Sequence, residues 1–378
     1  MTLHVALDGR IITDHFPGIG RYAYHLAGAL ARRGDIDLTL LIDSTARSTR
    51  YDLAALARSY PTITLRPIEI PSFTAAEQFR LAPVARTLRA DVWHSLYYIM
   101  PFFGLARYTP IALTVYDLIP LVLPQYWSSR NRLIFRVANR LALRAARQVM
   151  TLSESARRDL QRFFGMRADR VRVTPGAADA HFQPATAVAI ASLRDRYPLK
   201  TPYVLYVGIN KPPKNLVRLV EAFARIATRV EHDCVIAGAW DERYPEAKQR
   251  AVDLQVDQRV HFLGPIADAD LPALYSAADW FITASLYEGF GLPALEALAC
   301  GTPVLCSNTS SLPEVVGECG LLFDPIDVNS IAGTLEQALA DPARRERLRE
   351  QGLQRAAQFT WDKTAALTIE IYQTMTNR

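Results

Sequence analysis

Short apolar segments alternate with helical patterns along this chain in two series, which are separated by one irregular stretch. Short runs rich in Val, Ile and Leu are typical of buried parallel strands, and amphipathic patterns between them predict connecting helices. In the first series we expect strands at 4–8, 38–43, 63–67, 92–94, 111–115, 149–152 and 171–174. In the second series we expect strands at 203–207, 233–237, 260–262, 279–284, 304–306 and 320–323. This alternation predicts doubly wound α/β sheets.

The stretch 175–201 breaks the alternation with three prolines and many small residues. We therefore expect an N-terminal domain over 1–176, a linker over 177–201 and a C-terminal domain over 202–360. A last helix is expected within 361–378. Expected helices between strands include 21–33, 51–59, 74–88, 131–147, 154–164 and 216–230.

Composition fits a globular protein of two domains. The chain has 378 residues, of which 50% are hydrophobic and 21% charged, as expected for a chain that folds around ordinary cores. It has no apolar run of the ~18–20 residues that span a bilayer, and its start lacks the basic and apolar regions of a secretory signal. We expect a cytoplasmic protein.

One segment of the second series suits phosphate. A buried strand at 279–284 leads into a loop that contains Glu288, Gly289 and Gly291, and then into a helix with Pro293 in its first turn. Such a unit directs backbone N–H groups and the positive end of the helix at one point. A second glutamate, Glu296, follows within the helix. Carboxylates accept hydrogen bonds from sugar hydroxyls, so the segment favours a sugar nucleotide over a bare phosphate.

A second loop of this series carries two cations. Lys211 and Lys214 follow the strand at 203–207 and Gly208, on a turn stiffened by two prolines. Lysines at the carboxyl end of a strand can neutralise a departing diphosphate, and we expect Gly208 beside them to contact the substrate. A solvated lysine pair on a surface turn is the alternative.

These loops resemble those of retaining glycosyltransferase family 4, and the likeness is strongest over 203–325. The resemblance implies the GT-B fold, in which two Rossmann-like, doubly wound domains face a central cleft and the last helix crosses back to the first domain. It implies that Glu288 holds hydroxyls of the donor sugar and that Glu296 holds the ribose.

The same resemblance implies that backbone amides around Phe290, Gly291 and Leu292 hold phosphate and sugar. The family also places an arginine near its lysine. Here the neighbourhood reads Pro-Pro-Lys, and we expect Lys211 to take the place of the arginine beside Lys214.

A second departure lies in the first domain. Relatives commonly read His-Asp after the strand at 111–115, whereas this chain has Tyr116 and Asp117. A phenol donates a hydrogen bond but cannot do the proton chemistry of an imidazole near pH 7, which places more weight on Asp117. His94, at the end of a strand, is a further candidate for the cleft. The alternatives are loop capping by Asp117 and a structural hydrogen bond for His94.

The first helix is preceded by Gly18, Gly20 and Arg21. The pattern fits a permissive dinucleotide fingerprint, and Asp43 stands where a ribose-binding acid would lie. An NAD-dependent oxidoreductase is therefore the rival class. However, about nine residues separate Asp8 from Gly18, whereas the dinucleotide turn follows its strand at once. The resemblance to family 4 instead implies a loop whose amides lie near the donor phosphate and the acceptor.

Two Asp-x-Asp pairs, Asp35 with Asp37 and Asp268 with Asp270, could suggest a metal-bound nucleotide sugar. Their positions in a turn and at a helix start favour structural roles. The four cysteines form no Cys-x-x-Cys pair. We expect neither a metal nor a cofactor.

From Ser129 to Arg147 the chain has six arginines and no acid, and four of the arginines recur every fourth residue. A basic amphipathic helix with a nearby Trp and Tyr can lie on anionic lipid. A solvated helix that packs on the sheet is an equal alternative. No recognised nucleic-acid module accompanies these arginines.

The sequence therefore predicts a retaining, metal-independent hexosyltransferase that moves a hexose to a hydroxyl of a growing, lipid-linked saccharide in bacterial polysaccharide synthesis. The start of the first helix and the lysine loop resemble the mannosyltransferase branch, which makes GDP-mannose the expected donor and UDP-glucose the alternative. We expect the protein on the inner face of the plasma membrane as a peripheral protein. A non-catalytic protein that binds sugar nucleotides is a further alternative. The missing Arg and His favour it, and the presence of Glu288, Glu296 and Lys214 argues against it.

Overall fold

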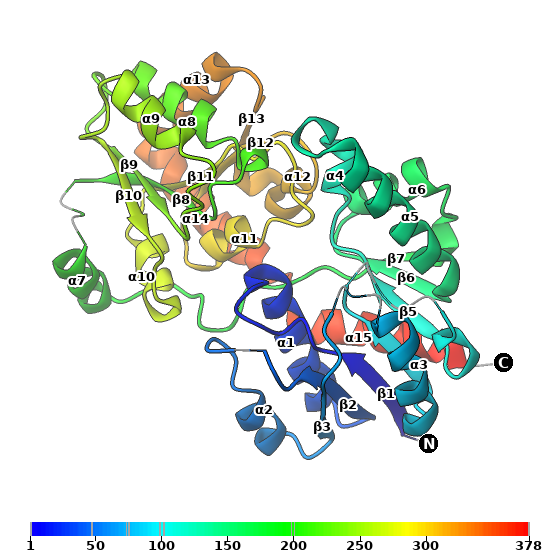
Figure 1. Ribbon diagram of the computed structural model, residues 1–378. Coiled ribbons are helices and arrows are strands. Elements are labelled where there is room, and N and C mark those ends of the chain that lie inside the picture. The colour runs from blue at the N-terminus through cyan, green and yellow to red at the C-terminus, as the bar shows by residue number, and fades with distance from the viewer. Residues whose placement is uncertain are drawn as a thin grey trace. The chain divides into compact units, whose positions relative to one another are not determined.

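The computed structural model describes residues 2–46, 48–72, 74, 76–97, 100, 103–197, 199 and 201–376. It divides the chain into two compact units (Figure 1). Unit 1 contains residues 1–176 and 360–378, and unit 2 contains residues 177–359.

Within the described residues, unit 1 is built on a parallel sheet in the order β3-β2-β1-β4-β5-β6-β7. Its strands are β1 (Leu3–Asp8), β2 (Ile36–Asp43), β3 (Ile63–Ile68), β4 (Val92–Ser95), β5 (Ile111–Thr114), β6 (Gln148–Thr151) and β7 (Val171–Val173). Its helices are α1 (Pro17–Arg32), α2 (Leu53–Ser59), α3 (Glu77–Leu88), α4 (Ile119–Val122), α5 (Ser129–Ala145), α6 (Glu154–Phe164) and α15 (Trp361–Thr376). Short 3₁₀ turns are η1 (Leu105–Arg107), η2 (Pro124–Tyr126) and η3 (Ala168–Arg170).

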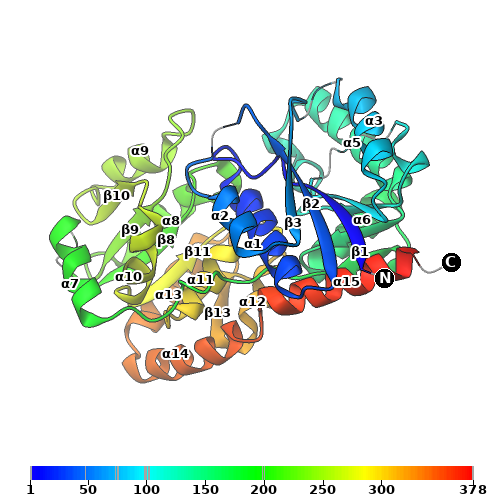
Figure 2. The ribbon, with the colours of Figure 1, turned by 90° about the horizontal axis from the view of Figure 1, so that it is seen from below.

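Helices cover both faces of the unit 1 sheet. The helices α3, α5 and α6 bury Leu81, Leu143 and Leu160 in one core. The helix α15 lies on the opposite face, against α1 and β4 (Figure 2). The C-terminal helix therefore completes the first unit of the chain.

Unit 2 has a parallel sheet in the order β10-β9-β8-β11-β12-β13 among the residues described. Its strands are β8 (Tyr203–Val207), β9 (Asp233–Ala237), β10 (Val260–Gly264), β11 (Trp280–Thr283), β12 (Val304–Ser307) and β13 (Gly320–Phe323). Its helices are α7 (Ala187–Arg196), α8 (Leu216–Ile226), α9 (Glu246–Asp253), α10 (Leu271–Ser276), α11 (Leu292–Ala299), α12 (Leu312–Val316), α13 (Val328–Leu339) and α14 (Pro342–Ala356). Short 3₁₀ turns are η4 (Pro212–Lys214), η5 (Asp268–Asp270) and η6 (Gly317–Cys319). One core lies under α8, α9 and α13.

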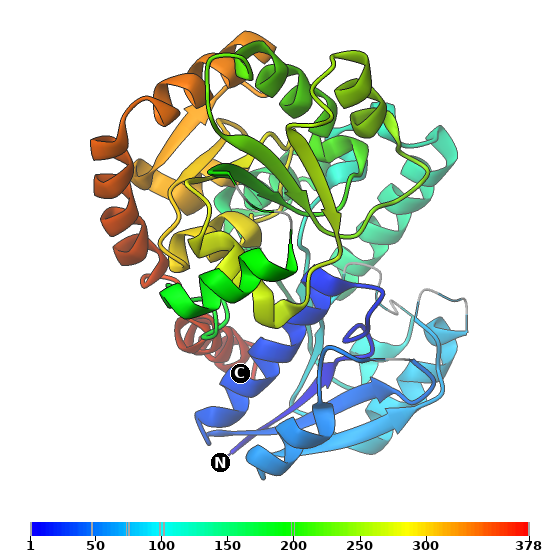
Figure 3. The ribbon, with the colours of Figure 1, turned by 90° about the vertical axis from the view of Figure 1, so that its left-hand side faces the viewer.

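Two predictions about these elements were wrong. The helix α1 begins at Pro17, four residues before the predicted start, because proline fits the first helical position and the Gly20 N–H closes the first turn onto the Phe16 carbonyl at 2.7 Å. The stretch 177–201, predicted as a linker, contains α7 and belongs to unit 2. There α7 lies beside α10 (Figure 3), and Arg196 forms an ion pair of 2.7 Å with Asp270.

Candidate active site

The strands β8 and β11 are neighbours in the unit 2 sheet, and the chain order reverses between them. In an open parallel sheet, the loops that leave the carboxyl ends of such a pair diverge and create a binding site. The loop after β8 carries Lys211 and Lys214, and the loop after β11 carries Glu288. The topology therefore brings the two predicted loops together.

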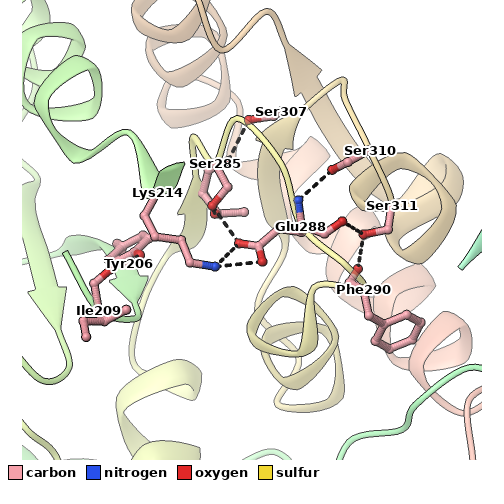
Figure 4. A network of polar contacts seen from close by, with 10 residues as sticks. Tyr206, Ile209, Lys214, Ser285, Glu288, Phe290, Ser307, Ser310 and Ser311 are labelled. Atoms are coloured by element: carbon pink, nitrogen blue, oxygen red, sulfur yellow. Dashed lines mark hydrogen bonds and ion pairs between the residues drawn. The ribbon is translucent and has the colours of Figure 1, made fainter. Parts of the chain in front are cut away.

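Lys214 and Glu288 form the centre of this site. The Lys214 ammonium donates to both carboxylate oxygens of Glu288, to Oε1 at 2.7 Å and to Oε2 at 2.8 Å (Figure 4). Their side chains are 25% and 15% exposed, so a ligand can still reach the pair. This arrangement places a cation and a hydroxyl acceptor side by side, as a sugar diphosphate requires.

Three serines hold the Glu288 loop, although no sequence motif points to them. The Ser285 hydroxyl donates to Glu288 Oε1 at 2.7 Å. The backbone N–H of Glu288 donates to Ser310 Oγ at 3.0 Å, and the Ser311 hydroxyl donates to the carbonyls of Glu288 and Phe290 at 2.9 and 2.7 Å (Figure 4). Ser310 adopts a left-handed conformation with φ of 56°, which is uncommon outside glycine. Ser285 therefore holds the carboxylate, and Ser310 and Ser311 hold the backbone of its loop.

Asn215 fixes the lysine turn, although no sequence motif points to it. Its φ of 60° lets the chain turn from η4 into α8, a conformation that asparagine tolerates better than most residues. Its buried amide donates to the carbonyls of Ala284 and Pro325 at 2.9 and 2.8 Å. The Leu286 N–H also donates to the Pro213 carbonyl at 2.8 Å. These bonds join the loop of Lys214 to the loop of Glu288.

The glycine loop leads into α11 at Gly291, whose φ of 106° favours glycine. A Cβ atom there would lie 2.9 Å from Leu312 Cδ2. Leu292 is the first residue of α11, and the first amides of a helix lack an acceptor within the helix. The Phe290 side chain is buried beside Phe359. The amides near Leu292 stay predicted phosphate ligands, together with the backbone of Gly208 after β8.

Glu296 lies on the buried side of α11. Only 3% of the residue is exposed, and one carboxylate oxygen accepts a 3.0 Å hydrogen bond from the Tyr275 hydroxyl. The structure therefore gives it a partner on α10 rather than placing it beside Lys214. Its predicted contact with ribose stays a prediction.

Lys211 is not part of the central ion pair. Its side chain is exposed, and its charge acts on Asp241 after β9. Hydrogen bonds from Arg243, with a smaller effect of Lys211, lower the pKa of Asp241 to about 2. The Asn210 amide, which donates to the carbonyls of Asp241 and Tyr244, ties the two loops together. That Lys211 replaces the family's arginine stays a prediction, and Arg243 is a second candidate for the same place.

The residues Gly18, Gly20 and Arg21 lie within the first turns of α1 in unit 1. Residues 9–16 separate the end of β1 from this helix. A dinucleotide fold needs its glycine turn directly between strand and helix, so this geometry argues against the NAD-dependent rival. A role for these residues in binding donor phosphate stays a prediction.

His94 is a structural residue, and its predicted place in a cleft was wrong. The side chain on β4 is fully buried. Its Nδ1 lies 2.6 Å from the Tyr372 hydroxyl of α15, and its Nε2 lies 2.8 Å from the Thr114 hydroxyl of β5. Burial lowers the pKa of His94 to about 3. It is a neutral ring that joins α15 to the sheet.

Asp117 and Tyr116 follow β5. One Asp117 oxygen accepts a 3.0 Å hydrogen bond from the Ile119 N–H at the start of α4, which is the capping role considered as the alternative. The Tyr116 ring packs edge-on against Tyr22. Its hydroxyl is buried and has no hydrogen-bond partner among the residues described. Burial, and then Tyr22 and Tyr97, raise the pKa of Tyr116 well above its usual value, so the phenol keeps its proton.

The described residues contain no group of three or more His, Cys, Asp or Glu side chains that could hold a metal ion. Of the Asp-x-Asp pairs, Asp270 is tied to Arg196, and Asp35 lies 3.7 Å from Arg33 on the surface. Both contacts are structural.

Comparison with known proteins decides the family. Residues 17–182 match the model of Glycosyltransferase Family 4, and residues 193–355 match that of Glycosyl transferases group 1. O-antigen chain mannosyltransferase B of Escherichia coli is 30% identical over 378 residues, which cover 94% of this chain and 96% of the relative. The chain belongs to glycosyltransferase family 4. The family predicted from the glycine and lysine loops is thereby confirmed.

This family 4 glycosyltransferase is also similar to the serotype-specific mannosyltransferase WbdA of Escherichia coli. The two are 33% identical over 263 residues, which cover 68% of this chain and 32% of WbdA. Among solved structures, Anabaena HepE in complex with UDP and glucose superposes with a TM-score of 0.77 at 21% identity, and each chain is covered completely. At this identity the superposition shows the fold, which is the predicted GT-B fold.

Proposed function

We propose that this enzyme is a retaining hexosyltransferase that moves mannose from GDP-mannose to a hydroxyl of a growing, lipid-linked saccharide in bacterial polysaccharide synthesis. The observation that carries the proposal is the Lys214–Glu288 pair at the carboxyl ends of β8 and β11. The choice of mannose is supported by two relatives that are named as mannosyltransferases. UDP-glucose is the alternative donor.

In the proposed reaction, Glu288 accepts hydrogen bonds from hydroxyls of the donor sugar, and Lys214 faces the diphosphate. The bond between the anomeric carbon and the phosphate oxygen breaks, and the acceptor hydroxyl forms a new bond on the same face. Its proton passes to the leaving phosphate, so the products are the extended saccharide and the nucleoside diphosphate. The ammonium stabilises charge that grows on the diphosphate as the bond breaks. Such preorganised charge is commonly worth about 3–4 kcal/mol of the barrier.

Amides near Leu292 and the exposed cations Lys211 and Arg243 are the further proposed phosphate ligands. Glu296 is proposed to accept hydrogen bonds from the ribose hydroxyls of the donor nucleotide. Asp117 and Tyr116 are proposed to orient the substrate. No step in this scheme uses a metal ion.

A further part of the proposal concerns α5 in unit 1. This helix exposes Leu133, Ile134 and Val137 at 63%, 54% and 49%, and Arg136, Arg140 and Arg144 are also exposed. None of the helices among the described residues combines the length and apolarity needed to cross a membrane. We propose that α5 lies on anionic lipid at the surface of the membrane, where a lipid-linked acceptor would be found.

The test uses the full chain with a panel of nucleotide sugars. GDP-mannose should raise the melting temperature most, and transfer to a saccharide acceptor should release GDP and give an α-linked product by NMR. UDP-glucose as the only productive donor would replace mannose in the proposal. Stabilisation by nucleotide sugars with neither transfer nor hydrolysis would instead support the non-catalytic binding protein.

A further inference from the structure

The sheet of unit 1 has its own point of chain reversal, between β1 and β4. The strands β1, β2 and β3 follow one another toward one edge of this sheet, and β4 to β7 follow one another toward the other edge. In an open parallel sheet, ligands bind at the carboxyl ends of the two strands between which the order reverses. Here the last residues of these strands are Asp8 and Ser95, which are paired with each other across the sheet. An acid and a hydroxyl therefore lie where a ligand is expected.

A small cavity lies at this point. Its polar lining consists mainly of the side chains of Asp8, Arg10, Glu77 and Ser95, and the Tyr97 ring forms part of its wall. The cavity has a volume of about 20 Å³, which is room for about one water molecule. A sugar ring is too large for this space, but one hydroxyl group of a sugar that lies outside can enter it.

Three of the lining side chains form a buried charge cluster. Arg10 is 5% exposed, and Asp8 accepts hydrogen bonds from its Nε at 2.8 Å and its Nη2 at 2.6 Å. Nη2 also donates to Glu77 at 3.2 Å, and Nη1 donates to the Ile70 carbonyl at 2.9 Å. Burial by itself lowers the pKa of Arg10, but Asp8 and then Glu77 raise it above its usual value, so the guanidinium stays charged. Two carboxylates and one guanidinium give the cluster a formal charge of −1.

Ser95 adds a hydrogen-bond donor to the cavity. Only 2% of the residue is exposed, and its oxygen accepts a 3.1 Å hydrogen bond from the Trp93 indole N–H. Within the part of the chain that the structure describes, the hydroxyl proton of Ser95 has no acceptor. A buried donor that lacks an acceptor costs free energy. A group that enters the cavity and accepts this proton would remove that cost.

A sugar hydroxyl matches both Asp8 and Ser95, because it donates one hydrogen bond and accepts others. An ionised carboxylate has no proton to give to Asp8, and the two buried acids repel it. At the wall of the cavity the half-buried rings of Tyr97 and Phe16 lie 5.8 Å apart. Apolar rings beside a few converging polar groups are typical of a site for a small molecule. The geometry therefore favours an uncharged polyol.

We propose that Asp8 and Ser95 hold one hydroxyl of the acceptor saccharide, and that the charge of the Asp8–Arg10–Glu77 cluster makes this site select neutral acceptors over anionic ones. Arg10 is a positioning residue, since its two hydrogen bonds fix the Asp8 carboxylate. The proposal rests on the proposed function and names the class of its acceptor, which is a sugar residue without a phosphate or a carboxylate.

The first test uses the full chain, its nucleotide sugar and pairs of acceptors. Each pair consists of a neutral hexose disaccharide and the matching disaccharide that ends in a uronic acid. The KM for the acceptor should be at least roughly tenfold lower for the neutral member, because like charges brought together are unfavourable. Equal KM values within the pairs, or a preference for the uronic acids, would overturn the proposal.

The second test removes the hydroxyl of the cavity. Ser95→Ala should raise the KM for the neutral acceptor by roughly five- to tenfold, the effect of one lost hydrogen bond. The KM for the nucleotide sugar, measured from hydrolysis without acceptor, should stay at the wild-type value. The matched control is Thr109→Val, because Thr109 is also buried and donates to the Ala90 carbonyl at 2.9 Å, before the amino ends of β4 and β5. The same acceptor KM in both variants would show that Ser95 does not contact the acceptor.

Glu77→Gln tests the charge separately from the hydroxyl. This change takes the formal charge of the cluster from −1 to zero and nearly keeps the shape of the side chain. The preference for the neutral member of each pair should then shrink. A cluster with only a structural role would instead lower the melting temperature and leave the preference at the wild-type ratio, which would contradict the proposal.

A binding measurement separates failure of this proposal from failure of the proposed function. If the full chain neither transferred nor hydrolysed any nucleotide sugar, the proposed function would fail. Line broadening of the neutral disaccharides in NMR spectra would then test the cavity alone. Binding that Ser95→Ala weakens and Thr109→Val does not would support the site, and absence of binding to wild type would overturn it.

Discussion

Glu288 reaches a ligand with much of its hydrogen-bonding capacity already in use. An ionised carboxylate offers about four lone-pair sites, and Lys214 and Ser285 occupy three of them. A sugar hydroxyl must therefore take the remaining site or replace the ammonium. If the hydroxyl replaces the ammonium, Lys214 becomes free to turn toward the diphosphate. The carboxylate of Glu288 then serves the sugar while the cation serves its leaving group.

Replacing Lys214 should separate its role from that of Lys211. Lys214→Met removes the cation that faces Glu288, and kcat should fall by roughly 10²–10³-fold because growing charge on the diphosphate loses a preorganised partner. Lys211→Met, at an exposed position with its charge near Asp241, should lower kcat by less than tenfold. Steady-state kinetics of both variants measure this. Equal losses would show that the ion pair has no special role.

Ser285 should matter for turnover more than for stability. Its side chain is buried and donates to Glu288 Oε1, so Ser285→Ala leaves the carboxylate less firmly held, and kcat should fall about tenfold. Ser276→Ala is the matched control, because that hydroxyl donates to the Cys300 carbonyl, away from the ion pair. Both variants lose two hydrogen bonds, because Ser285 also contacts the Thr283 hydroxyl and Ser276 also accepts from the Ala185 N–H, and each bond is worth about 1 kcal/mol. Similar kcat values for the two variants would contradict a positioning role.

Among the secondary-structure elements, the strands could be predicted from local sequence patterns. The strands of both sheets lie close to the predicted segments, because short apolar runs between helical patterns are readable without tertiary information. The helix α7 was missed because the three prolines and many small residues of 175–201 are typical of a linker, and its ion pair from Arg196 to Asp270 spans 74 residues. No local pattern reveals such a contact.

The site shows the same limit. The loops of Lys214 and Glu288 were predictable because each directly follows a strand, and strand order brings their ends together. Ser310 was not predictable, because it meets the Glu288 backbone from 22 residues away. His94 was predicted wrongly for a related reason. Its position at the end of a strand was visible in the sequence, but the α15 partner that encloses it was not.

His94 should make the junction of β4 with α15 sensitive to acid. Its ordinary pKa of 6.5 falls to about 3 in the folded protein because burial disfavours the charged ring. Below pH 6.5 the unfolded chain therefore binds a proton that the folded chain does not. Stability should fall with pH from 6.5 toward 3, by about 1.4 kcal/mol per unit. Above pH 6.5 this residue should have no effect.

Melting temperatures at pH 7 and pH 5 measure this effect. The fall in melting temperature from pH 7 to pH 5 should be smaller in His94→Gln than in wild type, because glutamine does not titrate. His15→Gln, at an exposed position, is the control and should keep the wild-type shift. An unchanged shift in His94→Gln would assign the acid sensitivity to other groups.

The whole molecule is assembled from a chain that leaves unit 1 at Gly176 and returns to it at Thr360. Unit 2 is continuous in sequence, with its own sheet and core. Unit 1 is discontinuous in sequence, because it includes α15 from residues 361–376. This helix supplies the Tyr372 hydroxyl to His94 and the Thr364 hydroxyl to the Pro175 carbonyl. The Trp361 ring also packs against Tyr22. This asymmetry predicts different responses of the two units to truncation.

Removal of residues 360–378 should therefore destabilise unit 1 alone. The deletion uncovers the β4 side of the sheet and loses the buried side chains of Ile369, Tyr372 and Met375, each worth roughly 2–5 kcal/mol in a core. Calorimetry of the full chain should show two unfolding transitions, and GDP should raise the melting temperature of only one of them, that of unit 2. Residues 177–359 expressed alone should fold and show this GDP-sensitive transition. The chain 1–359 should keep it and lose the GDP-insensitive transition of unit 1. If the truncated chain kept both transitions, α15 would be a peripheral helix rather than part of unit 1, and the contacts of His94 with Tyr372 would contribute little to its stability.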